Sequence, residues 1–274
     1  MTETGEAKMG EPQGGGGLAH WARQTLARSW GDKTARPRME DGKVVWQTST
    51  MEALLAGVFD GDVSVHDLLR HGDFGLGTFN GLDGEMVVLD RICYQLRADG
   101  TASTAGPDER SPFAVVTTFS PDAVLDIDEP TDRLSLLSKI DEVLPSKNII
   151  VAVRADGAFS TMRTRTVAKQ RRPYPPFVDA TSDESEHALA DVSGTLAGFR
   201  TPDFEEGISV AGYHLHFLDG VRQSGGHVLD FTFEKGRVEL SFSTDVHLSL
   251  PRFGAFLTAD LTGPNVAADI HRTE

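Results

Sequence analysis

The chain has little cysteine and no long apolar run, and both absences narrow the classes of protein it can belong to. Cys93 is the only cysteine among 274 residues, so neither an intramolecular disulfide nor a thiolate metal cluster can form. Any bound metal must therefore be held by carboxylates and by some of the nine histidines. No run of 18 apolar residues occurs, and the polar start of the chain lacks the basic and apolar parts of a secretion signal. We expect a cytoplasmic protein.

Basic residues are also scarce relative to acidic ones. The chain has 26 lysine and arginine residues against 41 aspartate and glutamate residues, a formal net charge of -15. A surface with this balance repels phosphate backbones and anionic lipid headgroups, so neither nucleic acid nor a membrane is an expected partner. The chain contains no Gly-x-Ser-x-Gly elbow, no phosphate-binding Gly-x-x-x-x-Gly-Lys loop and no dinucleotide fingerprint after a strand. Hydrolase and nucleotide-dependent functions are therefore disfavoured.

The pattern of apolar residues predicts three segments. Residues 1–45 form a flexible, glycine-rich tail and a short amphipathic arm. Residues 46–175 form an N-terminal mixed α/β domain, which ends at a proline-rich stretch, and the acidic residues 179–186 follow that boundary. Residues 176–274 form a C-terminal β domain with strands expected at 192–199, 208–218, 226–234 and 237–248, and with a hairpin turn at 234–237.

Three histidines in the C-terminal part have a spacing that favours a metal site. His214 and His216 are two residues apart within a strand pattern, so both imidazoles point to one face. His227 follows a glycine-containing turn, and it lies opposite the pair if the two strands form a hairpin. Three imidazoles leave open coordination positions for a catalytic divalent metal. The alternative is that all three are ordinary strand and turn residues.

The histidine segments belong to a set of short motifs that occur in order along the chain. They are Gly77–Phe79, Leu82–Glu85, Pro112–Ala114, Thr164–Thr166, Gly198–Pro202, and Gly212–Phe217 with Gly225–His227. From about Met51 to the C-terminus the sequence thereby resembles the α-acetolactate decarboxylase family. The resemblance implies a metal on the three histidines, usually Zn2+, and decarboxylation of (S)-2-acetolactate to (R)-acetoin and carbon dioxide. It also implies a homodimer whose subunits each have two β-rich domains.

The resemblance further assigns roles to residues outside the histidine cluster. Glu85 and Arg165 match catalytic residues of the family, Thr78 matches a threonine of the substrate pocket, and Glu274 matches the family's second glutamate. The predicted fold class is therefore α/β of the α+β type. It combines an N-terminal mixed sheet with helices and a C-terminal, mainly antiparallel sheet or barrel, with the metal site between them.

The chemistry of the implied reaction explains why such residues are needed. Loss of carbon dioxide leaves an electron pair that flows into the neighbouring ketone as an enediolate, which a divalent metal can stabilise. Arg165 would hold a carboxylate or the enediolate oxygen. Glu85 or Glu274 would deliver the proton, which requires a pKa raised by burial or by a neighbouring carboxylate. We expect one glutamate to act as the acid and the other as a base or orienting group.

Two other kinds of function share parts of this pattern. Cupin-like oxygenases and carbonic-anhydrase-like hydratases also place His-x-His on a strand, but Gly220 and Val221 stand where a cupin would have a glutamate. A non-catalytic, metal-dependent sensor of small acids would use Arg165 to bind its ligand and would need neither glutamate. Release of carbon dioxide from acetolactate by the wild type and by Glu85→Gln distinguishes a sensor from a decarboxylase.

Overall fold

The structure, a computed structural model, describes residues 1, 43–181, 184–261 and 270. Most of the predicted tail and arm therefore lies outside the described residues. The last two residues assigned to the arm, Val44 and Val45, instead begin strand β1 (Val44–Thr48). In the described part of the chain, no helix combines the length and apolar character needed to cross a membrane.

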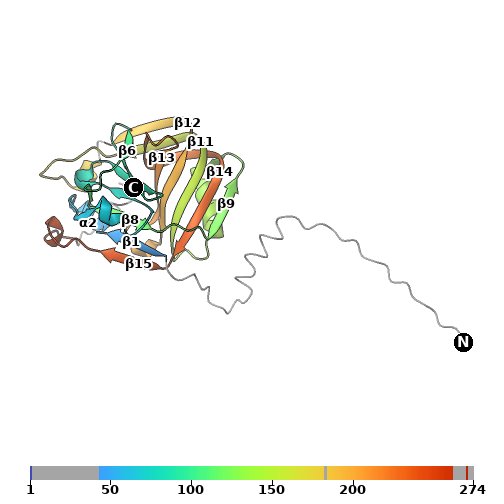
Figure 1. Cartoon of the computed structure of the whole chain (residues 1–274), viewed down its shortest axis with the longest axis horizontal. Coiled ribbons are helices and arrows are strands. Elements are labelled where there is room, and N and C mark those ends of the chain that lie inside the picture. The colour runs from blue at the N-terminus through green and yellow to red at the C-terminus, as the bar shows by residue number, and fades with distance from the viewer. Residues whose placement is uncertain (2–42, 182–183, 262–269, 271–274) are drawn as a thin grey trace. The chain divides into compact units, whose positions relative to one another are not determined.

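The first sheet has seven strands in the order β15-β1-β8-β3-β4-β5-β6 (Figure 1). β1 pairs with β15 in parallel, and the other neighbours in this sheet are antiparallel. Thr50 caps the first helix and Ser64 caps the second with a side-chain oxygen. The elements of this part of the fold are α2 (Met51–Leu55), β2 (Val63–Ser64), α3 (Val65–Leu68), β3 (Phe74–Thr78), η1 (Asn80–Leu82), β4 (Glu85–Leu89), β5 (Ile92–Leu96), β6 (Ala102–Thr104), β7 (Arg110–Ser111), β8 (Phe113–Thr117) and β15 (Asp245–Ser249).

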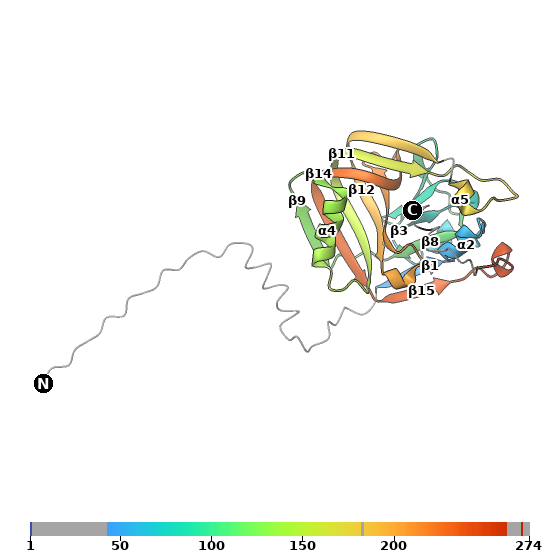
Figure 2. The same ribbon diagram turned by 180° about the vertical axis from the view of Figure 1, so that it is seen from behind.

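The second sheet has six strands, in the order β10-β14-β11-β12-β13 with β9 paired to β14, and all its pairs are antiparallel. β13 also pairs with the start of β14, so β14, β11, β12 and β13 form a closed circuit of paired strands. Figure 2 shows α4 lying against β14. The elements here are β9 (Ala123–Ile127), β10 (Thr131–Asp132), α4 (Arg133–Val143), β11 (Ile150–Thr166), α5 (Phe177–Ala180), β12 (Ser185–Thr201), η2 (Asp203–Glu205), β13 (Gly212–Asp219) and β14 (Gly225–Ser243), and η3 (Ala255–Leu257) follows β15.

The hairpin turn predicted at residues 234–237 is wrong, because β14 runs through this segment without reversing. Gly236 lies opposite Gly157 of β11, and a Cβ atom on Gly236 would come within 2.3 Å of the carbonyl oxygen of Asp156. The glycine therefore permits a close approach of two long strands, which is a second common use of glycine within a sheet. β12 begins at Ser185, inside the acidic residues 179–186, and so starts before the strand expected at 192–199.

The two sheets exchange strands along the chain and share one core. β9, β10 and β11 precede residue 175 but join the second sheet, whereas β15 follows it and joins the first. The sheets thus do not divide at the predicted boundary, because the chain passes from the first sheet to the second between β8 and β9 and returns to the first at β15. Leu76 and Val87 of the first sheet belong to the same buried cluster as Ala152 and Phe199 of the second. The predicted mixed, strand-rich α+β class is confirmed.

Candidate active site

A tight turn places the three histidines. The turn joins β13 to β14, and Oδ1 of Asp219 accepts hydrogen bonds from the backbone N–H groups of Gln223 (2.7 Å) and Ser224 (3.2 Å). The resulting register sets His216 directly opposite His227. His214 lies two residues before His216 and thus on the same face of the strand. The hairpin arrangement that the spacing predicted is therefore present.

The three imidazoles converge on one point. One ligand nitrogen from each of His214, His216 and His227 lies within 4.8 Å of the others, and all three side chains are buried. Nε2 of His214 is 3.2 Å from Nε2 of His216. Two nitrogens bound to one tetrahedral zinc ion at about 2.0–2.1 Å would lie about 3.3 Å apart. The cluster therefore has the dimensions of a metal site.

The protonation state of the histidines also fits a cation. The Nδ1–H group of His216 donates to the carbonyl oxygen of Met86 at 2.9 Å, which leaves the lone pair on Nε2 facing the other rings. Burial lowers the pKa of His216 to about 4, with a smaller contribution from the charge of Arg165. Burial likewise holds the pKa of His214 well below its usual range. Both imidazoles are thus neutral at pH 7, as metal ligands must be.

The first sheet contributes two of the predicted site residues through the hairpin between β3 and β4. Thr78 and Glu85 are paired across this hairpin, and the Thr78 hydroxyl donates to the carbonyl oxygen of Gly84 at 2.8 Å. Gly84 has a φ of 84°, and a Cβ atom there would approach the carbonyl oxygen of Leu96 to 2.1 Å. Only glycine satisfies both conditions. The Asp-Gly-Glu motif therefore positions Glu85 at the beginning of β4.

Glu85 faces the histidine cluster from the opposite sheet. Its Oε2 atom is 3.6 Å from Nε2 of His216, and its side chain is only 15% exposed. Burial raises the pKa of Glu85 to about 8, an effect that Arg165 opposes and the charge of Glu184 reinforces. The carboxyl group therefore carries its proton at neutral pH and can donate it.

Arg165 supplies positive charge to the same space. It lies on β11 directly opposite His227 of β14, and its Nη1 atom is 3.0 Å from Oε2 of Glu184. The side chains of Arg165 and Glu184 are each only 13% exposed. Glu184 was not among the predicted site residues, because the acidic composition of its segment resembles a solvated linker. That composition contained no local signal for pairing with an arginine 19 positions earlier in the chain.

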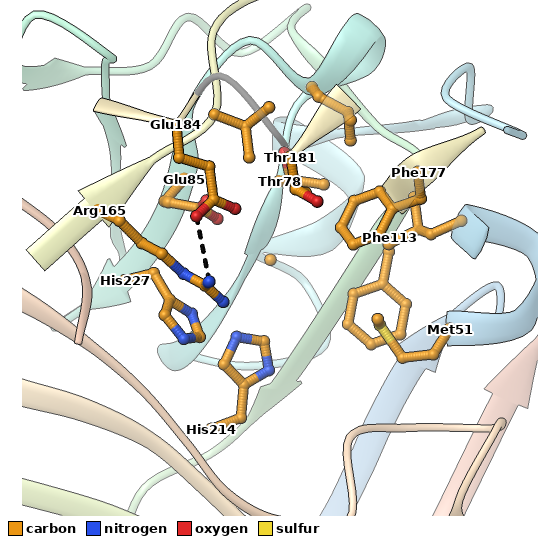
Figure 3. A pocket seen from close by; sticks show the side chains of 14 residues that line it. Met51, Thr78, Glu85, Phe113, Arg165, Phe177, Thr181, Glu184, His214 and His227 are labelled. Carbon is orange, nitrogen blue, oxygen red and sulfur yellow. Dashed lines mark ion pairs between the residues drawn. The ribbon is translucent and has the colours of Figure 1, made fainter. Parts of the chain in front are cut away.

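These side chains line one pocket, which has a polar and an apolar side (Figure 3). Glu274, the second predicted glutamate, lies outside the described residues. Ile270, four positions earlier, is fully buried in the cluster that contains Phe113 and Phe177 of the pocket wall. The polar lining comprises Thr78, Glu85, Arg165, Thr181, Glu184, His214 and His227, and the apolar lining comprises Met51, Leu54, Gly77, Leu82, Phe113, Val167 and Phe177.

The fold and site together define a class: strand-rich α+β proteins in which three buried histidines capable of binding a metal face a small pocket with an arginine and a protonated carboxyl group. Residues 45–263 match the sequence model of the family described as Alpha-acetolactate decarboxylase. The chain belongs to this family, and the resemblance identified in its sequence is thereby confirmed.

Individual members of this family are similar in sequence to this protein over most of its length. Alpha-acetolactate decarboxylase from Klebsiella aerogenes is 46% identical over 231 residues, which cover 84% of this chain and 89% of the relative. The protein of the same name from Methylococcus capsulatus is 44% identical over 230 residues, which cover 84% of this chain and 88% of the relative. The crystal structure of acetolactate decarboxylase from Bacillus subtilis subspecies spizizenii superposes with a TM-score of 0.83 at 44% identity, covering 84% of this chain and all of that one.

Proposed function

We propose that this protein decarboxylates (S)-2-acetolactate to (R)-acetoin and carbon dioxide, using a zinc ion held by His214, His216 and His227. The observation that carries the proposal is that three buried imidazoles converge on one point beside a pocket lined by two of them, by Arg165 and by the buried Glu85. The names of the relatives support the choice of reaction.

The polar side of the pocket suits an anionic substrate with adjacent oxygen atoms. When bound, a divalent cation polarises the ketone oxygen and offsets the negative charge that decarboxylation leaves on the substrate. The planar guanidinium of Arg165 can donate paired hydrogen bonds to a carboxylate. Because the chain carries a net charge of -15, this local cation is needed to attract an acid into the pocket.

Glu85 is the proposed proton donor. Its carboxyl group carries a proton at neutral pH and lies within 3.6 Å of the histidine cluster, where the substrate carbon would lose its carboxylate. Transfer of this proton to the carbon of the enediolate yields the hydroxyketone and leaves Glu85 ionised. The direction from which the proton arrives determines the handedness of the product.

Glu274 is the proposed second glutamate, with a role as base or orienting group. The burial of Ile270 among pocket-wall residues supports this assignment.

The apolar side of the pocket has a complementary role. Met51, Phe113 and Phe177 form a wall opposite the charged groups in Figure 3. Such a wall accommodates the two methyl groups of acetolactate and limits the access of water to the developing negative charge. Thr78, whose hydroxyl is engaged with the β3–β4 turn, contributes to the shape of the pocket.

We also propose that the protein is a homodimer. β15 lies at the edge of the first sheet, and its outer residues Val246 and Leu248 are 47% and 36% exposed. Leu250, just beyond the strand, continues this row at 49% exposed. An edge strand with exposed apolar side chains is commonly covered by a partner. Sedimentation velocity would measure the predicted doubling of the 29.6 kDa chain mass.

A cytoplasmic location stays a prediction.

The proposed reaction is tested by measuring acetoin and carbon dioxide formed from acetolactate before and after chelation, with zinc added back. We expect turnover in the metal-loaded protein, its loss on chelation and its recovery with metal. Turnover that persists after metal removal has been verified would refute the metal-dependent mechanism. A metal-dependent sensor would bind small acids without releasing carbon dioxide, and an oxygenase would consume oxygen.

A further inference from the structure

Glu184 is a pocket carboxylate to which the mechanism above gives no role. It immediately precedes β12, it lines the same pocket as Glu85 and His214, and its Oε2 atom is 3.0 Å from Nη1 of Arg165. Figure 3 shows this ion pair on the polar side of the pocket. The carboxylate of Glu184 therefore pairs with the same guanidinium group that would bind an anionic substrate.

We propose that Glu184 is a positioning residue that anchors one edge of the Arg165 guanidinium and restrains its affinity for the carboxylate of the substrate. The inference rests on the proposed decarboxylation, in which Arg165 receives an acid. It assigns to Glu184 no contact with the reacting atoms.

The geometry of a guanidinium group explains the anchoring. The group is planar and has five N–H donors, so a carboxylate held at one nitrogen does not exhaust its capacity to meet a second anion. Both side chains of the pair are 13% exposed, so water screens their attraction less than it would at a surface. Arg165 is thereby held in one orientation toward the pocket before the substrate arrives.

The restraint on affinity follows from the direction of the reaction. The carboxylate of the substrate leaves as uncharged carbon dioxide, so an arginine that binds this carboxylate very tightly stabilises the ground state and slows the reaction. The negative charge of Glu184 offsets part of the field of Arg165 and weakens that binding. It also disfavours ionisation of Glu85, whose pKa it helps to raise. Burial raises the pKa of Glu184 itself, whereas Arg165 opposes this effect.

The chain offers a closely matched control for a substitution at this position. Glu186 is two residues further along and forms the corresponding ion pair with Arg163 at 3.0 Å. That pair is at the surface, with side chains 62% and 53% exposed, and neither residue lines the pocket. Glu186→Gln therefore removes the same charge from nearly the same place in the chain without changing a side chain that lines the pocket.

The test measures binding of lactate to the full-length, metal-loaded protein by calorimetry, with lactamide as the uncharged analogue. Glu184→Gln should bind lactate about threefold to tenfold more tightly than the wild type, with little change for lactamide. Glu184→Asp, which keeps the charge, should stay within about twofold of the wild type, as should Glu186→Gln. With acetolactate, Glu184→Gln should lower both KM and kcat. A purely structural role for Glu184 would not tighten lactate selectively.

Two further variants identify the cause of the effect. Glu184→Ala removes the carboxylate without leaving an amide in its place, and it must tighten lactate binding as Glu184→Gln does. In an Arg165→Gln background, Glu184→Gln should no longer tighten lactate binding, because the two effects act through one arginine. Thermal unfolding of each variant verifies that it is folded.

The outcomes separate this inference from the proposed reaction. Lactate binding that is unchanged or weaker in both Glu184→Gln and Glu184→Ala overturns the role of Glu184, even if the wild type decarboxylates acetolactate. So does a failure of every variant and of the wild type to bind lactate, because Arg165 would then be no receptor for acids. If the Glu184 variants tighten on lactate as expected but the wild type releases no carbon dioxide, the reaction alone is refuted.

Discussion

Oε2 of Glu85 lies 3.6 Å from Nε2 of His216, so the candidate proton donor and a candidate metal ligand meet across the contact between the two sheets. The next residue, Met86, accepts a hydrogen bond from Nδ1 of the same imidazole at 2.9 Å. Two consecutive residues of β4 thus contact the two nitrogens of one ring. This arrangement couples the position of the acid to the position of the metal site, because the ring cannot turn without losing the bond to Met86.

Glu85→Gln should abolish most of the activity while leaving the site intact. Glutamine has nearly the same volume and can still hydrogen-bond, but it cannot donate a proton to carbon. Loss of a general acid lowers kcat by about a hundredfold to ten-thousandfold. Acetoin formation measures the loss, and metal analysis should give the same zinc content as the wild type. A variant that retains a tenth of the wild-type kcat would exclude Glu85 as the donor.

The rate should fall as the pH rises. The active form of Glu85 is protonated, and burial raises its pKa to about 8, so an increase in pH through this value removes the proton that the reaction consumes. A cation on the neighbouring histidines favours the ionised carboxylate and moves the fall to lower pH. We therefore expect kcat, measured from pH 5.5 to 9.5 with saturating acetolactate, to decline tenfold per pH unit on its alkaline side, with the midpoint at or below about pH 8. A kcat that stays constant up to pH 9.5 would contradict this assignment.

The histidine cluster could be predicted because its signal is local. His214 and His216 alternate correctly for one face of a strand, and the number of residues before His227 fits a hairpin. The positions of Glu85 and Arg165 were assigned by family resemblance, and the structure brings both to the same pocket. Their proximity could not be derived from spacing, since it depends on how two sheets pack.

The features that could not be predicted from the sequence depend on pairing between distant segments. Arg165 lies opposite His227 because β11 and β14 align over almost their whole lengths, and no pattern within either strand determines that register. The same long pairing explains why Gly236 permits close approach where a turn was expected. Glu184 escaped notice for a related reason. Its acidic neighbours indicate a solvated segment, and only the approach of Arg165 from another strand makes it a pocket residue.

The turn before Glu85 offers a test of how strictly the backbone positions the acid. Gly84→Ala introduces a Cβ atom at a φ of 84° and within 2.1 Å of the Leu96 carbonyl oxygen, so the backbone must move. Gly254→Ala is the matched control, because Gly254 has a φ of 83° but a Cβ atom there would meet nothing within 4 Å. The control should lose about 1 kcal/mol of unfolding free energy from backbone strain alone, and Gly84→Ala about 3 kcal/mol, measured by urea denaturation.

The same pair of variants separates stability from catalysis. A displacement of about 1 Å in a catalytic group can reduce the rate about a hundredfold, so Gly84→Ala should lose most of its kcat at temperatures where it is still folded. Gly254→Ala should keep the wild-type kcat, because Gly254 is not among the residues that line the pocket. If Gly84→Ala were as stable and as active as the control, the hairpin would tolerate movement. The position of Glu85 would then depend on its contact with His216 rather than on the Asp-Gly-Glu turn.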